Sequence, residues 1–477
     1  MILALLLACA VEPGGPAGGE PGPRPVRDSG VEDSGEAYAP PAFANPAEAE
    51  DLDDEPAVVR VRLTAAPAVH AFQLPPEDGG ALVEREGYAY NGLLPGPTIR
   101  ARLGDTLIVE LENALDLPTT LHWHGMHVPF EMDGGTWMLD PVEPGESTTY
   151  SFSLDHAGTF WYHPHFNSDA TVDAGLYGFV VVEDPDEPAT DQELLMLFDD
   201  WALPGYGEAD GEDDHGMDGE VGRWTLNGLV DPVITLTGGE TARVRLLNVS
   251  NVGYLSLSWP EMRVIAGDQG LSAAISDEPV LLGPGDRAEA EWRPGAEGFV
   301  VEDLGYTANG GAMDMAEDRV VVEVESPADA APALDWGMTG DAPTEDPGRT
   351  DLLYTLSGDV VTGEWFINGE QWPDVTIAEV ALDSTVVVEV RNLSPTEHPF
   401  HMHGYGLELL SVDGVAPAHR TFEDTINVPI YSAVRLLLRA DNPGEWMTHC
   451  HILPHAEGGM MTVIDVLDMD ASPRAVR

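Results

Sequence analysis

Ten of the fifteen histidines of this chain lie in four short clusters. Imidazole nitrogens bind copper, zinc, iron and nickel, and packing alone does not explain so many histidines in so few places. The clusters therefore predict a metal site. They read His122-Trp123-His124-Gly125, His163-Pro164-His165, His398-Pro399-Phe400-His401-Met402-His403-Gly404 and His449-Cys450-His451-Ile452-Leu453-Pro454-His455.

The last cluster combines a thiol with imidazoles. Cys450 is followed by His455 and then by Met460, and one Cys, two His and a weakly bound axial Met form a blue, or type 1, copper site. His398 is the best donor of the second His. Side chains of neighbouring strand residues point to opposite faces, so both flanking histidines should face away from Cys450. The sequence thus predicts two metal sites joined by one backbone segment.

An internal repeat supplies the elements that position these residues. Asn-Gly turns occur at Asn91, Asn227 and Asn368, and each is followed by Pro and then by a strand of alternating polarity. Alternation with period two predicts strands with one buried face. We expect an all-β protein of three consecutive Greek-key β-sandwiches. Their predicted ranges are 55–187, 188–328 and 345–470, called the first, second and third repeat below.

The eight histidines outside the type 1 group form four His-x-His pairs. Residues i and i+2 of a strand share a face, so each pair can bind adjacent ions. Eight imidazoles suit three ions that take two, three and three ligands. All four pairs lie in the first and third repeats, so we expect the cluster where these two meet, with the second repeat as a spacer. The pairs are 122/124, 163/165, 401/403 and 449/451.

Together the four clusters resemble the copper motifs of three-domain, laccase-like multicopper oxidases of the bacterial type. The resemblance covers about residues 55–470 and implies cupredoxin domains with four copper ions. It assigns the type 1 copper to His398, Cys450, His455 and Met460, and the type 2 copper to His122 and His401. It assigns one type 3 copper to His124, His163 and His451, and the other to His165, His403 and His449.

The resemblance also implies the reaction. A phenol or similar organic donor would lose single electrons at the type 1 copper, and O2 would be reduced to water at the other three. Asp133 matches the acidic position that relays protons near the type 2 copper. A second acid often follows the last type 1 His, but Ala456 stands there, and Glu457 is the candidate one residue later.

The same fold would be compatible with two other functions, a metallo-oxidase and a non-catalytic scaffold. A metallo-oxidase would take electrons from Cu(I), Fe(II) or Mn(II); no dense methionine block supports it, although acidity favours it somewhat. A non-catalytic scaffold of the same fold would have lost copper ligands, and none is missing here.

Composition limits the partners and the location. The net charge is −63 and every basic residue is Arg, which disfavours nucleic acid and anionic membrane surfaces. Two cysteines exclude a disulfide framework. Residues 1–9 resemble a lipoprotein signal that ends at Cys9, and residues 10–54 resemble a disordered Pro/Gly/acidic tether. We expect export to the periplasm or cell envelope, a lipid anchor on Cys9, and a monomer.

Overall fold

The computed structural model describes residues 38–135, 139–204, 222–309, 311–312 and 317–468. The predicted signal and most of the predicted tether therefore lie outside the described residues. Residues 40–477 make up one of two compact units, and nearly all of the other, Met1–Ala39, falls in the part that is not described.

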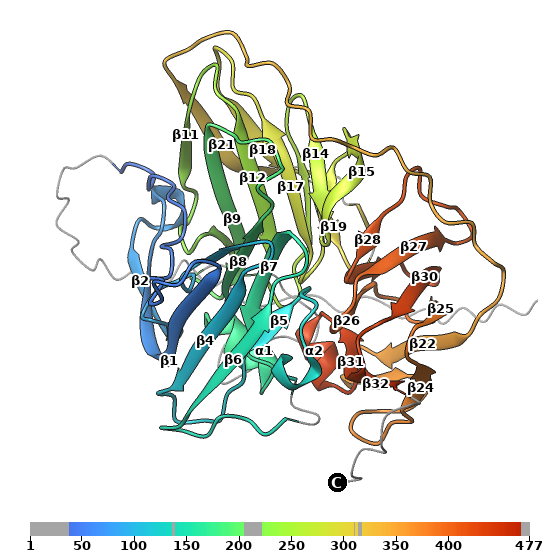
Figure 1. Cartoon of the computed structure of the whole chain (residues 1–477). Helices are drawn as coiled ribbons and strands as arrows, with labels where there is room; N and C mark the ends of the chain where they lie inside the picture. Colours follow the sequence, from blue (N-terminus) through green and yellow to red (C-terminus); the bar gives the residue numbers. More distant parts are fainter. Residues whose placement is uncertain (1–37, 136–138, 205–221, 310, 313–316, 469–477) are drawn as a thin grey trace, which may run out of the picture. The chain divides into compact units, whose positions relative to one another are not determined.

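The first repeat contains eight strands in two four-stranded sheets (Figure 1). Their orders are β2-β1-β4-β6 and β3-β8-β7-β5. The strands are β1 (Val58–Gln73), β2 (Leu82–Tyr90), β3 (Ile99–Arg102), β4 (Thr106–Asn113), β5 (His122–His124), β6 (Ser147–Ser153), β7 (Gly158–His163) and β8 (Gly178–Glu183). The short helix α1 (Ser168–Asp173) and the 3-10 turns η1 (Pro76–Asp78) and η2 (Phe130–Met132) lie in its loops.

The second repeat contains a six-stranded sheet, a five-stranded sheet and a small hairpin. The orders are β10-β9-β12-β17-β14-β15, β11-β21-β18-β13-β16 and β19-β20. The strands are β9 (Gln192–Trp201), β10 (Arg223–Leu226), β11 (Val233–Thr237), β12 (Ala242–Asn248), β13 (Leu255–Ser258), β14 (Val264–Gly267), β15 (Gly270–Ser276), β16 (Val280–Leu282), β17 (Arg287–Trp292), β18 (Phe299–Asp303), β19 (Tyr306–Thr307), β20 (Gly311–Ala312) and β21 (Glu317–Glu325).

The third repeat again has two sheets, ordered β23-β22-β25-β30-β27-β28 and β24-β32-β31-β26-β29. Helix α2 (Leu453–Glu457) lies between its last two strands. The strands are β22 (Leu352–Asp359), β23 (Glu364–Ile367), β24 (Ala378–Ala381), β25 (Ser384–Asn392), β26 (His398–Met402), β27 (Leu407–Val412), β28 (Phe422–Glu423), β29 (Thr425–Val428), β30 (Ala433–Ala440), β31 (Gly444–Cys450) and β32 (Met461–Leu467).

The three repeats share one topology. In each, the first strand pairs in parallel with the second strand after the Asn-Gly turn: β1 with β4, β9 with β12, and β22 with β25. A hydrophobic core fills each repeat. The all-β, cupredoxin-like fold expected from the sequence is confirmed.

Two asparagines per repeat explain why the pattern recurs. The turn residues Asn91, Asn227 and Asn368 have φ of 54°, 53° and 57°, which asparagine tolerates in a tight hairpin turn. A second asparagine ends each parallel-paired strand and is buried. Its side chain binds the backbone of the following loop and the backbone of a second segment farther along the chain. In the second repeat, Asn248 Nδ2 donates to Gly253 O (2.8 Å) and Leu282 O (3.0 Å), and its Oδ1 accepts from Ser250 N (3.0 Å). Asn113 and Asn392 make the corresponding contacts.

The prediction of a disordered tether is wrong for residues 40–54. Phe43 N donates to Val233 O (2.9 Å), and Ala49 N donates to Thr98 O (2.8 Å). Both acceptors lie at or beside strands that end a sheet, β11 and β3. A Pro-rich extended chain can cover such an edge because exposed edges offer unpaired backbone groups. Composition alone could not reveal this pairing.

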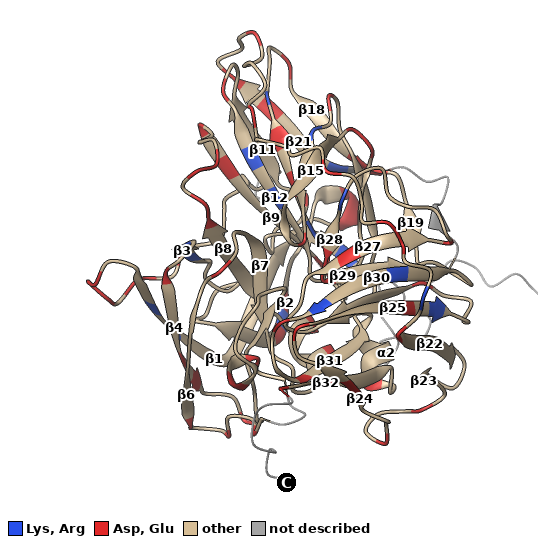
Figure 2. Ribbon diagram, turned by 45° about the vertical axis from the view of Figure 1, so that its right-hand side comes forward, with Lys and Arg blue, Asp and Glu red and all other residues tan. Residues whose placement is uncertain are grey.

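Acidic residues are spread over the loops and strands of all three repeats, with far fewer basic ones (Figure 2). Within the described ranges, no helix is long and apolar enough to span a membrane.

Replacing Asn248 by Ala should destabilise the second repeat. Leu282 O and Ser250 N would lose the bond that Asn248 makes, and Gly253 O would keep only its bond from Ser250 Oγ. Leaving buried polar groups unsatisfied costs about 1–3 kcal/mol. We expect the free energy of unfolding of the apo-protein to fall by about 3 kcal/mol in urea unfolding. Ser256→Ala, at a half-buried position of β13, is the control and should change it by under about 0.5 kcal/mol. Equal effects of the two substitutions would contradict the proposed role of Asn248.

Candidate metal centres

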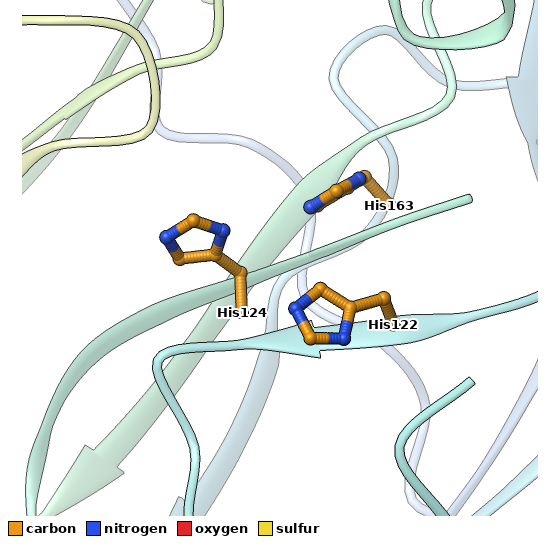
Figure 3. A group of neighbouring side chains, drawn as sticks. All are labelled: His122, His124 and His163. Carbon is orange, nitrogen blue, oxygen red and sulfur yellow. The ribbon is translucent and has the colours of Figure 1, made fainter. Parts of the chain in front are cut away.

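Four short strands carry most of the clustered histidines, and they are paired two by two. In the first repeat His122 of β5 lies opposite His163 of β7. In the third repeat His401 of β26 lies opposite His449 of β31. Because alternate residues share a face, each strand pair presents its imidazoles together. Figure 3 shows the imidazoles of His122, His124 and His163 around a common space.

The two sets meet across the interface between the first and third repeats. His122 stacks on His403 and His124 stacks on His401, both with ring centroids 3.8 Å apart. His165 lies 5.1 Å from His449, measured between ring centroids. The ring centroids of His163 and His451 are 5.7 Å apart. The structure thus brings all eight histidines together where the sequence placed them.

The nitrogens that face the middle of this group lack partners. His122 Nε2, His124 Nδ1, His163 Nε2, His401 Nε2 and both nitrogens of His451 are buried without a hydrogen bond to any described residue. Nε2 of His449 lies 3.1 Å from that of His403 and 3.3 Å from that of His165. Unpaired buried nitrogens are unfavourable, and metal cations at their centre would satisfy them. The donor set therefore fits metal binding.

Burial keeps these imidazoles neutral. It lowers the pKa of seven of them, and neighbouring histidines lower it further: His124, His163, His165, His401, His403, His449 and His451. The pKa of His165 falls to about 3. Neutral imidazole is the form that binds metals, so these side chains are ready to coordinate near pH 7.

Two buried carboxylates hold the outer nitrogens of the stacked pairs. Asp133 accepts from His122 Nδ1 through its backbone oxygen (3.0 Å) and from His403 Nδ1 through Oδ2 (2.9 Å). Asp424 repeats this arrangement for the other pair. Its backbone oxygen lies 2.9 Å from His401 Nδ1, and its Oδ1 lies 3.1 Å from His124 Nε2. Each carboxylate therefore ties one histidine of the first repeat to one of the third.

Sequence reasoning found Asp133 but missed Asp424. Asp133 follows its histidine cluster within a Gly-rich turn, whereas Asp424 stands 23 residues after His401, among many other acids. Burial opposes ionisation of Asp424, yet the adjacent Arg287 guanidinium holds the pKa of this carboxyl well below its usual range. No spacing rule would have selected Asp424.

The type 1 candidates form a second group on the other face of β31. Cys450 Sγ lies 3.4 Å from His398 Nδ1 and 3.7 Å from His455 Nδ1, and the two imidazole nitrogens are 3.2 Å apart. Met460 is fully buried in the same core cluster. Burial raises the pKa of the Cys450 thiol and lowers that of His398 to about 3. The predicted alternation along His449-Cys450-His451 is present.

One edge of this second group reaches toward the surface. His398 is completely buried and its Nε2 lies 2.7 Å from Ser394 Oγ. His455 is only half-buried, and the Trp365 ring stacks on it with centroids 3.7 Å apart. His455 is therefore the member of the group that is most accessible from outside.

Glu457, the candidate second proton donor, bonds Ser168 and none of the clustered histidines. Its Oε1 accepts hydrogen bonds from the backbone N–H and the hydroxyl of Ser168, both at 3.2 Å. Burial, and then the nearby Asp169, raise the pKa of Glu457. Glu457 thus links α2 to the start of α1 instead of contacting one of the clustered histidines.

Comparison with known proteins decides the family. Models described as multicopper oxidase match residues 77–187 and 344–470. The chain is 29% identical to multicopper oxidase MmcO of Mycobacterium tuberculosis, over 82% of this chain and 84% of that protein. It is 30% identical to multicopper oxidase mco of Staphylococcus aureus, over 79% and 83% of the two chains. The chain belongs to the multicopper oxidase family.

A solved structure has the same architecture. The multicopper oxidase of Campylobacter jejuni, described as a metallo-oxidase, superposes with a TM-score of 0.77 at 25% identity, over 90% of this chain and 96% of that one. As a multicopper oxidase, the present chain is a copper-dependent oxidoreductase that uses O2 as acceptor. The donor sets described above are chemically suited to copper.

Proton release on metal binding should distinguish the two groups. At pH 6 ordinary histidines, with a pKa near 6.5, would release protons to an incoming ion, but the buried set is already neutral. At pH 9 an ordinary thiol would be mostly ionised, but Cys450 has a raised pKa and should still release about one proton. Calorimetry of Zn²⁺ binding in buffers of different ionisation enthalpy measures the number of protons released at each pH.

Cys450→Ser is the control for this measurement. At pH 9 it should release about one proton fewer than the native chain. Equal release by the two proteins would show that the Cys450 thiol is not protonated before metal binds.

Proposed function

We propose that the chain binds four copper ions. His398, Cys450, His455 and Met460 would hold the type 1 ion, and His122 with His401 the type 2 ion. His124, His163 and His451 would hold one type 3 ion, and His165, His403 and His449 the other. Two of these sets are supported by distance: ligand atoms of His165, His403 and His449 lie within 4.8 Å of one another, as do those of His398, Cys450 and His455. His122 lies within the same distance of His124 with His163 and of His401 with His403, so the resemblance decides its assignment.

Copper in such sites supplies one-electron redox chemistry, and several ions together allow O2 to be reduced to water. The chain itself contributes the connection between the two sites. Cys450 belongs to one ligand set, and its covalent neighbours His449 and His451 belong to the other. This alternation on β31 is the single observation that carries the proposal. It places one peptide bond between Cys450, where an electron would enter, and each of the two histidines of the other ligand set.

We propose an organic donor such as a phenol, oxidised one electron at a time near His455. The half-buried His455 is the type 1 ligand that such a molecule would reach, and the Trp365 ring that stacks on it is itself buried. A metal-ion donor would need free carboxylates beside the type 1 ligands. Glu397, next to His398, is not free: Tyr306 donates to both of its oxygens (3.0 and 2.9 Å) and Asn427 donates to one.

The alternative is a metallo-oxidase. The C. jejuni structure carries that description, and a relative from Epichloe festucae, 25% identical, is named an iron transport multicopper oxidase. Oxidation of Cu(I), Fe(II) or Mn(II) is therefore the second candidate.

Oxygen uptake by the copper-loaded protein should decide between these donors. We expect the highest kcat/KM with a phenol and lower values with Cu(I) and Fe(II). Cys450→Ser should lose the visible band near ~600 nm and donor oxidation, because the thiolate is common to both. No O2 uptake with any donor would refute the oxidase assignment, and faster uptake with a metal ion would favour the alternative.

We propose Asp133 as a proton relay for O2 reduction. Its Oδ2 bonds His403, whereas its Oδ1 is buried 3.4 Å from His122 Nδ1 and has no hydrogen-bond partner among the described residues, so one carboxylate oxygen beside the ligands is left without a bond. Glu457 stays the predicted second donor. Its raised pKa keeps it protonated to higher pH than an ordinary Glu, but its bonds to Ser168 direct it elsewhere.

Asp133→Asn should lower kcat about 10²-fold, the lower end of what a positioned acid–base group contributes. The amide keeps an acceptor for His403 but cannot relay a proton, so copper content and the visible band should not change. Glu457→Gln is the matched carboxylate-to-amide variant and should cost less. A kcat and pH–rate profile unchanged by Asp133→Asn would exclude the relay.

We further propose export to the periplasm or cell envelope as a lipid-anchored monomer. The support is the apolar run that ends at Cys9. Cys9→Ser should move the protein from the membrane fraction to the soluble fraction. Membrane association that survives the substitution would argue against the anchor.

A further inference from the structure

The second repeat provides none of the histidine or cysteine ligands, yet one of its side chains reaches the ligand cluster. Arg287, the first residue of β17, is 2% exposed. Its Nη1 lies 2.8 Å from Asp424 Oδ1, and its Nη2 bonds the other carboxylate oxygen. Asp424 in turn contacts His124 and His401. A residue of the second repeat is thus two contacts away from ligands of the first and third.

We infer that Arg287 is a positioning residue of the trinuclear ligand set, which fixes Asp424 so that its carboxylate and backbone orient the imidazoles of His124 and His401. The inference rests on the proposed function only in taking those two histidines as metal ligands. It assigns the second repeat a part in the centre, where the sequence predicted only a spacer.

The guanidinium satisfies all its donors in three repeats at once. Arg has five N–H groups in a rigid planar fork, and each has an acceptor here. Nε donates to Thr159 O (3.1 Å), Nη1 to Gly285 O (3.1 Å) and Asp424 Oδ1 (2.8 Å), and Nη2 to Asp268 O (3.0 Å) and Asp424 Oδ2. These acceptors belong to the first, second and third repeats, so the guanidinium locks the interface of all three at this point.

The Gly of the first histidine cluster leaves room for this ion pair. Gly125 has φ of +83°, and a Cβ on it would collide with Arg287 Nη2 and Asp424 Oδ2. Gln269 adds a link, because its Nε2 donates to Gly125 O (2.8 Å) and Asp424 Oδ2 (2.5 Å). The backbone that follows His124 is therefore shaped around the Arg287–Asp424 pair.

The carboxylate that Arg287 fixes bonds the outer side of the ligands. Asp424 Oδ1 lies beside His124 Nε2, and Thr425 Oγ1 lies 2.9 Å from the same nitrogen. With Nε2 held there, His124 turns Nδ1 toward the centre, where it is buried and without a described partner. Groups that orient metal-binding imidazoles in this way typically affect metal affinity 10–100-fold when they are mutated.

The test uses Arg287→Lys and Arg287→Met in the full chain. Metal affinity is measured by chelator competition with Zn²⁺ and Cu²⁺, and the type 2 copper environment by electron paramagnetic resonance. We expect affinity at the eight-histidine set to fall about 10–100-fold and the type 2 spectrum to shift. The visible type 1 band should persist, because the guanidinium of Arg287 bonds Thr159, Gly285, Asp268 and Asp424 and none of that group's ligands.

Arg245 is the matched control. It too is 2% exposed in the second repeat, bonds Thr159 of the first repeat at Oγ1 (2.9 Å), and pairs with Glu289 and Glu193. Arg245→Lys and Arg245→Met remove a buried cation with similar ties but no bond to Asp424. If these variants lose metal affinity as much as the Arg287 variants do, the inference is wrong. It is equally wrong if the Arg287 variants keep native affinity and spectra.

A double variant covers the case in which Arg287→Met does not fold. Arg287→Met with Asp424→Leu removes both charges, and such replacement of a buried pair is often neutral for stability. A purely structural pair would then leave metal affinity native, which would overturn the inference, whereas a positioning role predicts that the loss persists. A native chain that binds metal at both groups but consumes no O2 would refute the proposed function. The role of Arg287 would then still be decided by the metal affinities of its variants.

Discussion

The structure depends on burying eight imidazoles whose unbonded nitrogens face one another. Each unpaired nitrogen would cost about 1–3 kcal/mol if nothing bound it, so the fold must hold the rings against a tendency to turn away. It does so from outside: backbone carbonyls and two carboxylates bond the opposite nitrogens. A metal cation at the centre would give these nitrogens the partner that the described residues do not provide.

The two carboxylates make similar contacts but differ in their surroundings. Asp133 and Asp424 each bridge one histidine of the first repeat and one of the third. Asp424 is neutralised by Arg287 from the second repeat, whereas Asp133 keeps a buried oxygen without a described partner. One carboxylate is therefore fixed by a buried cation, whereas the other has an oxygen that no described residue bonds.

Local patterns in the sequence predicted most of the fold and the ligands, because strand alternation and His-x-His spacing act over a few residues. Cys450 and its flanking histidines face opposite ways for that reason. Arg287 and Asp424 could not be predicted, since they are 137 residues apart and nothing local distinguishes that acid among 84. The pairing of residues 40–54 with two sheet edges was missed because composition describes what a segment does by itself. It carries no information about a distant strand with unpaired backbone groups.

The start of β17 shows why the second repeat cannot be a neutral spacer. Gly285 and Arg287 lie two residues apart. Gly285 has φ of +89° and packs so closely on His451 that a Cβ would lie 2.9 Å from its ring, while Arg287 acts on His124 and His401 through Asp424. A shift of this single turn would therefore move ligands assigned to both the type 2 and type 3 ions. The geometry of the copper cluster thus depends on how the second repeat seats between the other two.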